Sequence, residues 1–156
     1  SNYARYDLKD KIIILKGNTQ SIEAKTFKLK SKKIISFDDI KKIATSEGDV
    51  KLFLSGPISI FSKRIDAKFD NINNNLISAS AQGNVKIETK AETITSNSAK
   101  YNNKTNLISL EGNVIIKRDK SILTGEKGHM NLKTRKSKIE SSKSKRGKGV
   151  FSPIQK

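Results

Sequence analysis

A repeat of about 30 residues is the feature that most constrains this chain. Four copies share a glycine followed by a polar residue: Gly17-Asn18-Thr19, Gly48-Asp49-Val50, Gly83-Asn84-Val85 and Gly112-Asn113-Val114. Their glycines are 31, 35 and 29 residues apart, and Asn-Leu-Ile-Ser precedes both of the last two copies. A unit this short cannot bury an apolar face by itself, so successive units are expected to stack on one another.

Around the glycines, apolar and polar residues alternate with a period of two. Ile77, Ala79, Ala81, Val85 and Ile87 share one parity in the third copy, and Ile108, Leu110, Val114 and Ile116 share one in the fourth. This alternation predicts strands with one buried face. A glycine inside a strand is typical of a bulge or bend. Residues 65–69 and 93–101 are predicted to be second strands, joined by polar Asn/Asp/Lys turns.

The pattern predicts an all-β fold, with the stacked strands forming a solenoid, a sandwich or a folded-over sheet. The hydrophobic share of 34% suits one thin row of interior side chains better than a thick core. One stretch, residues 37–44, has some helical character, with Asp38 or Asp39 as a cap, although Ile40 and Ile43 also suit a loop. We expect a single domain over residues 1–140 and a basic tail over 141–156.

The chain is strongly basic, with 32 Lys and Arg against 15 Asp and Glu and a formal charge of +17. This charge favours an anionic partner, which could be nucleic acid, anionic lipid or acidic polysaccharide. Nucleic acid is the less favoured partner, because only five of the basic residues are arginine and the nine Phe and Tyr residues are scattered.

The sequence offers little for catalysis, cofactors or metal binding. Cysteine is absent, and the single histidine, His129, has no triad partner or metal-ligand spacing around it. The paired carboxylates of Asp38 and Asp39 suit a turn better than a general acid and base. A complete phosphate-binding loop is also missing. We therefore expect a protein without enzymatic activity, cofactor or metal.

Strands with an apolar inner face and lysine-rich edges suit an amphipathic ligand that carries acyl chains and phosphates. The sequence resembles the OstA-like (LptA) family of lipopolysaccharide-transport proteins, best from residue 57 to 156. The resemblance rests on segments 56–67, 83–87, 101–102, 110–114 and 123–126 and on the basic ending with Val150-Phe151-Ser152-Pro153.

The resemblance implies an open, twisted β-jellyroll of antiparallel strands that bridges the periplasm and carries lipopolysaccharide from the inner to the outer membrane. It also implies lipid A as ligand, LptC and LptD as partners, and end-to-end homo-oligomers through terminal strands. The first thirty residues lack a signal-peptide core, so a periplasmic chain would have lost that segment. An LptC-like domain of the same pathway, a nucleic-acid-binding β protein and a self-assembling β-solenoid are the alternatives.

Under this resemblance, two groups of residues are candidates for contact with the lipid. An acyl-chain trough is predicted to consist of the inward-facing residues and two aromatic residues at the turns: Ile77, Val85, Ile87, Ile108, Leu110, Val114, Ile116, Phe69 and Tyr101. The headgroup phosphates are predicted to meet Lys63, Arg64, Lys86, Lys117 and Arg118. The same trough positions would be ordinary core in any β protein, and a solvated lysine face would explain most of the second group.

Overall fold

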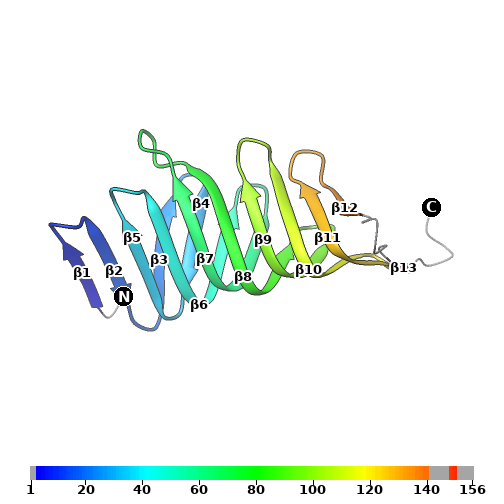
Figure 1. The fold of residues 1–156 in the computed structure, drawn as a ribbon, viewed down its shortest axis with the longest axis horizontal. Helices are drawn as coiled ribbons and strands as arrows, with labels where there is room; N and C mark the ends of the chain where they lie inside the picture. The colour runs from blue at the N-terminus through cyan, green and yellow to red at the C-terminus, as the bar shows by residue number, and fades with distance from the viewer. Residues whose placement is uncertain (1–2, 141–147, 151–156) are drawn as a thin grey trace.

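The computed structural model describes residues 3–140 and 148–150, and these residues form β-strands joined by turns (Figure 1). All of the described strands belong to one sheet with antiparallel neighbours. The strands are β1 (Tyr3–Asp7), β2 (Ile12–Lys16), β3 (Gln20–Ala24), β4 (Phe27–Ser31), β5 (Ile34–Asp38), β6 (Ile43–Leu54), β7 (Ile58–Phe69), β8 (Leu76–Glu88), β9 (Thr93–Asn102), β10 (Leu107–Arg118), β11 (Ser121–Asn131), β12 (Lys136–Glu140) and β13 (Lys148–Val150).

The long strands fold this sheet into two layers. The first half of β6 pairs with β5 and its second half with β4, and β7 to β11 also pair through both halves. One layer runs from β1, β2 and β5 to β12, and the other begins with β3 and β4 and ends with β13. Figure 1 shows the long strands curving from one layer into the other. Among the described residues the sheet ends at β1 and β12 without closing, which confirms the expected open β-jellyroll.

The repeated glycines lie where the strands cross between the layers. In the last three copies the glycine and the residue after it both have positive φ: Gly48 and Asp49 (88° and 47°), Gly83 and Asn84 (84° and 50°), Gly112 and Asn113 (81° and 48°). The strand register shifts at each of these pairs. A Cβ on Gly83 would lie 3.0 Å from Cδ of Lys63 on the neighbouring strand. The repeat glycine thus provides both the left-handed backbone and the space that the bend requires.

The strands between these glycine-containing strands use serine at the same bend. Ser62 of β7 donates its hydroxyl to the carbonyl of Arg64 at 2.8 Å, and Ser96 of β9 donates to the carbonyl of Ser98 at 2.9 Å. Both serines are buried, so these local bonds satisfy their hydroxyls inside the fold.

The hairpin turns of the β1–β12 layer share one design. Their first side chain accepts hydrogen bonds from the backbone N–H groups two and three residues later, at Asp7, Asp38, Asp70, Asn102 and Asn131. The residue four positions after it has positive φ in every case. The helical expectation for residues 37–44 is therefore wrong, because Asp38 ends β5 and caps a turn, and β6 begins at Ile43.

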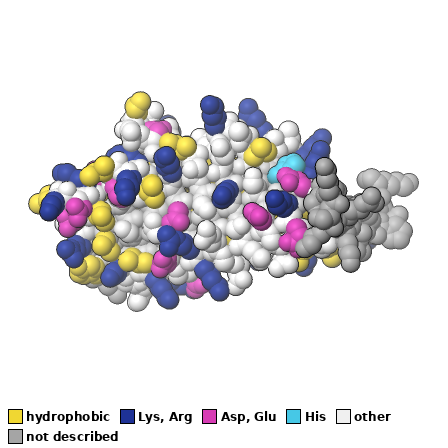
Figure 2. All heavy atoms as spheres, viewed as in Figure 1, with side chains coloured by type: hydrophobic (Ala, Val, Ile, Leu, Met, Phe, Trp, Pro, Cys, Tyr) yellow, Lys and Arg dark blue, Asp and Glu magenta, His cyan; other side chains and the backbone are white. Residues whose placement is uncertain are grey.

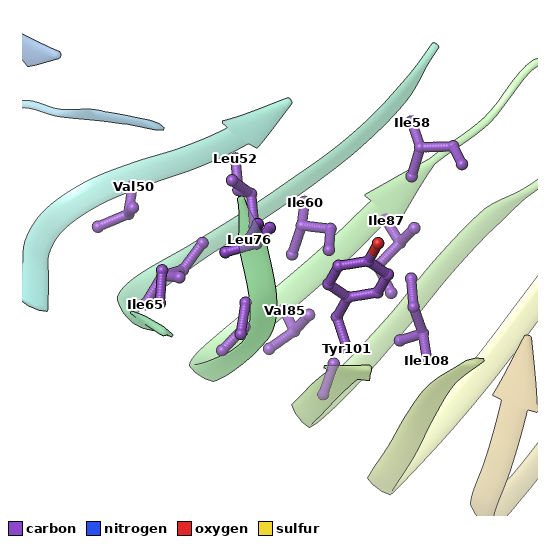
Figure 3. Close-up of a cluster of buried hydrophobic side chains, with 14 of the residues drawn as sticks. Val50, Leu52, Ile58, Ile60, Ile65, Leu76, Val85, Ile87, Tyr101 and Ile108 are labelled. Carbon is purple, nitrogen blue, oxygen red and sulfur yellow. The ribbon is translucent and has the colours of Figure 1, made fainter. Parts of the chain in front are cut away.

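The core lies between the two layers, where the inward-facing aliphatic side chains meet. Leu29, Leu52, Ile65, Ile87 and Ile108 have no exposed surface. Figure 3 shows that the labelled side chains come from successive strands and converge on one interior. Most of the alternation read from the sequence matches this arrangement.

Ile77 is the exception, because it was expected to point inward and is 39% exposed, whereas Leu76 is 4% exposed. Lys68 of β7 pairs with Ser78 and Phe69 pairs with Leu76, which leaves Ile77 as the extra residue of a β-bulge. One inserted residue reverses the parity of the strand on one side of it. The inward orientation predicted for Ile77 is therefore wrong.

Candidate functional site

An apolar pocket opens between the two layers at the N-terminal end of the fold. Its volume is about 380 Å³. It is lined by hydrophobic side chains from five strands, among them Ile13, Leu15, Ile22, Phe27, Phe37 and Phe69. Figure 2 shows hydrophobic side chains gathered at this end, whereas Lys and Arg are spread over the visible face. The pocket lies at the N-terminal end of the described array, where no other strand among residues 3–140 covers this apolar face.

Three aromatic rings from different strands form one wall of the pocket. The ring centroids of Phe27 and Phe69 are 4.9 Å apart, and those of Phe37 and Phe69 are 6.0 Å apart at an angle of 63°. Phe69 ends β7 just before the Asp70 turn, so the hairpin holds its ring in place. Such a wall can contact a flexible alkyl chain without requiring any directional bond.

Polar residues at the mouth of the pocket are paired with one another or with neighbours. Asp39 accepts a 2.6 Å hydrogen bond from Nζ of Lys42, and both residues line the pocket. Glu23, also in the lining, lies 3.2 Å from Nζ of Lys28. The mouth therefore carries charge, while the interior of the pocket is apolar.

The structure gathers most of the predicted trough residues in the closed core, away from this pocket. Val85, Ile87, Ile108, Leu110, Val114 and Ile116 are each at most 2% exposed. Tyr101 is 8% exposed, donates its hydroxyl to Oδ1 of Asn103 at 2.9 Å, and has its pKa raised by burial. Of the predicted trough residues, only Phe69 also lines the pocket.

Sequence reasoning missed the pocket because its residues were treated as another copy of the repeat. Ile13 and Leu15 follow the same alternation as the later copies. The available signal was their position in the first of the four copies, since the outermost copy of a stack has one face that no other copy in this sequence covers.

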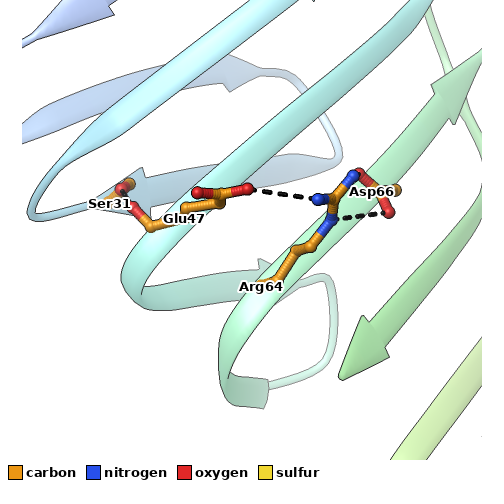
Figure 4. A network of polar contacts seen from close by, with 4 residues as sticks. All are labelled: Ser31, Glu47, Arg64 and Asp66. Atoms are coloured by element: carbon orange, nitrogen blue, oxygen red, sulfur yellow. Dashed lines mark hydrogen bonds and ion pairs between the residues drawn. The ribbon is translucent and has the colours of Figure 1, made fainter. Parts of the chain in front are cut away.

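The predicted headgroup residues lie outside the pocket, and three of them are paired with carboxylates. Nη1 of Arg64 lies 3.1 Å from Glu47, and its Nε lies 3.2 Å from Asp66 (Figure 4). The hydrogen bond to Asp66 is the main cause that raises the pKa of the Arg64 guanidinium. The carboxylates of Glu47 and Asp66 therefore neutralise much of the positive charge of Arg64 within the protein.

The other four predicted headgroup residues differ in their surroundings. Lys86 lies 2.8 Å from Glu88, and Arg118 lies 3.0 Å from Glu92. Lys63 and Lys117 are both exposed, and the aliphatic part of the Lys63 side chain lies against Gly83. Of these, Lys63 and Lys117 are the more accessible to a phosphate.

Towards the C-terminal end, polar contacts join the two layers. Oε1 of Glu92 accepts a 2.8 Å hydrogen bond from Oγ of Ser137 in β12, in addition to its pair with Arg118. Nη1 of Arg135, in the β11–β12 turn, donates to the carbonyl of Gly56 at 3.0 Å. The carboxylate of Glu92 is only 1% exposed, so the layers meet tightly at this point.

Two kinds of feature are absent from the described part of the chain. Residues 3–140 and 148–150 contain no cluster of three or more His, Cys, Asp or Glu that could hold a metal ion. In the same residues, no helix is long and apolar enough to cross a membrane.

These features define an open β-jellyroll with an apolar interior that is accessible at one end. The chain belongs to the family described as LptA/(LptD N-terminal domain) LPS transport protein, whose model matches residues 21–136, more than half of the sequence, and again residues 93–149. A solved structure with the same fold is LptH from Pseudomonas aeruginosa, described as the LptA homologous periplasmic component of the lipopolysaccharide transport device. The similarity has a TM-score of 0.66 at 15% identity and covers 96% of this chain and 100% of that one. No curated protein matches the sequence.

Proposed function

We propose that this chain is a periplasmic lipopolysaccharide-binding bridge protein that carries lipopolysaccharide from the inner to the outer membrane. The observation that carries the proposal is the apolar pocket open between the layers of a lipopolysaccharide-transport fold. Membership in a family of transport proteins supports a role without catalysis. The match along the whole of an LptA homologue favours this role over that of an LptC-like domain.

The pocket is where an acyl chain of the lipid enters the protein. A volume of about 380 Å³ lies within the range of sites that bind small molecules. Each methylene that leaves water contributes about 0.8 kcal/mol, so even one partly buried chain gives appreciable affinity. The closed row from Val85 to Ile116 continues the same interior. We expect it to contact the lipid only when the two layers separate.

The unpaired edges of the sheet are the proposed contacts with other proteins of the pathway. Among the described strands, β1 and β12 end one layer, and their outer edges can each add a strand from another chain. A second copy would extend the array end to end. Proteins with the same kind of domain, such as LptC and LptD, would use the same edges.

Photo-crosslinking from inside the pocket tests the proposed function. Benzoylphenylalanine replaces Leu15, which lines the pocket. In a control variant it replaces Ile122 of β11, which is 37% exposed. We expect purified lipopolysaccharide to crosslink to the Leu15 variant and only weakly to the Ile122 variant. Equal labelling of both variants, or none with folded protein, would contradict the proposal. Retention of nucleic acid at physiological salt would favour the nucleic-acid alternative instead.

A further inference from the structure

The mouth of the apolar pocket contains one cation among the described residues that line it. This cation is Lys42, the last residue of the turn between β5 and β6. None of the predicted headgroup residues lines this pocket. An amphipathic ligand with its acyl chain in the pocket would therefore bring its anionic group to Lys42 first.

The backbone of Lys42 is held firmly in place. Its φ is 56°, which the capped turn starting at Asp38 imposes, and its carbonyl accepts a 2.9 Å hydrogen bond from the backbone N–H of Phe69. The position of the lysine is thereby tied to β7 and to the aromatic wall of the pocket. A fixed cation beside an apolar wall loses little freedom when it binds an anion.

The ammonium group lies at the boundary between the apolar wall and water. Nζ is 5.9 Å from the ring centroid of Phe37, which also lines the pocket, and the side chain of Lys42 is 20% exposed. Partial burial strengthens its interaction with an anion compared with a lysine in open solvent.

Asp39 is the present counterion of Lys42, at 2.6 Å, and its side chain is 43% exposed. Asp39 occupies the second position of its turn, where the other four capped turns have Leu8, Asn71, Asn103 and Leu132. An acid here therefore occurs only in the turn at the pocket mouth. A more exposed carboxylate can be exchanged for a ligand anion that arrives together with a buried acyl chain.

We propose that Lys42 binds a phosphate of lipid A whose acyl chain occupies the pocket, and that this phosphate replaces Asp39 as its counterion. This inference rests on the proposed function and names the residue that receives the headgroup. Removing Lys42 should weaken binding of the phosphorylated lipid, and removing the charge of Asp39 should strengthen it.

Binding of two lipids to matched variants tests this exchange. Lys41→Gln is the control for Lys42→Gln, because it removes the same charge from the same turn at an exposed residue outside the pocket lining. Diphosphoryl lipid A and its dephosphorylated form are titrated into the full chain and each variant. Circular dichroism verifies that every variant is folded.

For diphosphoryl lipid A, we expect Lys42→Gln to weaken binding about tenfold, the size of one charge-assisted contact, and Lys41→Gln to change it less than about twofold. Asp39→Asn should tighten binding about threefold, since it removes the competing carboxylate. Dephosphorylated lipid A should bind equally well to the unchanged chain and to Lys42→Gln.

Equal losses in Lys42→Gln and Lys41→Gln would overturn the inference, because they would indicate a general charge effect. A loss in Lys42→Gln that is the same for both lipids, or weaker binding by Asp39→Asn, would also overturn it. If the unchanged chain retained neither lipid, the proposed function and this inference would both be rejected.

Discussion

The two ends of the interior are built from the same repeat but differ in whether they admit a ligand. At the N-terminal end, the turns of the two layers leave an apolar pocket of about 380 Å³ between them. Towards the C-terminal end, Glu92 and Arg135 join the layers through Ser137 and the carbonyl of Gly56. The repeat therefore determines the path of the strands, while a few contacts between the turns determine access to the interior.

This difference follows from position in the array and from side-chain chemistry. Among the described residues, no strand covers the open side of the pocket at the N-terminal end, so the apolar face there stays partly uncovered. Near the other end, a carboxylate that is 1% exposed requires hydrogen-bond partners, and these partners come from both layers. The hydrogen bond from Ser137 and the ion pair with Arg118 thus join the two layers at this point.

Matched Ile→Ala substitutions at the two sites give the largest expected effect. Ile108 lies in the closed core with 0% exposure, whereas Ile13 lines the pocket and is only partly buried. Ile108→Ala should lower the free energy of unfolding by about 3 kcal/mol through lost burial and a new cavity, and Ile13→Ala by about 1 kcal/mol. Urea unfolding measures both. Equal losses would mean that the pocket end is packed as tightly as the core.

Glu92→Ala should open the closed end, with a somewhat smaller loss of stability. The substitution removes the shared partner of Arg118 and Ser137, and we expect unfolding to require about 2 kcal/mol less because the half-exposed Arg118 regains water. Hydrogen exchange of the β12 amides should become faster, while exchange in β2 stays unchanged.

Glu88→Ala is the control for Glu92→Ala. Glu88 is 44% exposed and pairs with Lys86 on the surface, so its loss should cost less than about 0.5 kcal/mol. A similar loss in both variants, or unchanged exchange of β12 in Glu92→Ala, would show that Glu92 does not hold the layers together.

Local patterns were enough to predict the strands and their bends. Period-two alternation identified the inward side chains of β8 and β10, apart from Ile77, and the repeated glycines marked the bends at Gly83 and Gly112. These features depend on residues close together in sequence, since the backbone conformation of a bend is determined by the residues that form it. The family resemblance then supplied the jellyroll architecture.

Features that depend on distant residues could not be predicted in the same way. The bulge at Ile77 arises from the register between β7 and β8, which alternation does not specify. Arg64 lies opposite Glu47 on the neighbouring strand and forms an ion pair with it. This ion pair neutralises part of the positive charge that the sequence predicts to meet a headgroup phosphate. The pocket is lined by residues from five strands that are distant in sequence, so no local pattern encodes it.

Tyr101, midway along the interior, provides the smallest expected effect and a test of how well the middle of the core excludes water. Tyr101→Phe removes the hydrogen bond to Asn103, so near neutral pH it should lower the free energy of unfolding by about 1 kcal/mol.

Burial raises the pKa of the Tyr101 phenol, so its protonated form is favoured in the folded state. The resulting contribution to stability is complete below the ordinary tyrosine pKa of about 10 and is lost as the pH rises through the folded value. The variant lacks this alkaline loss, so over a range from about pH 8 to about pH 11 the gap between the two proteins should be constant at first and should narrow or reverse as the pH approaches and passes about 10. Urea unfolding of both proteins across this range measures the gap, and a gap that stays constant would mean that water reaches the phenol and that the middle of the interior is as open as the pocket end.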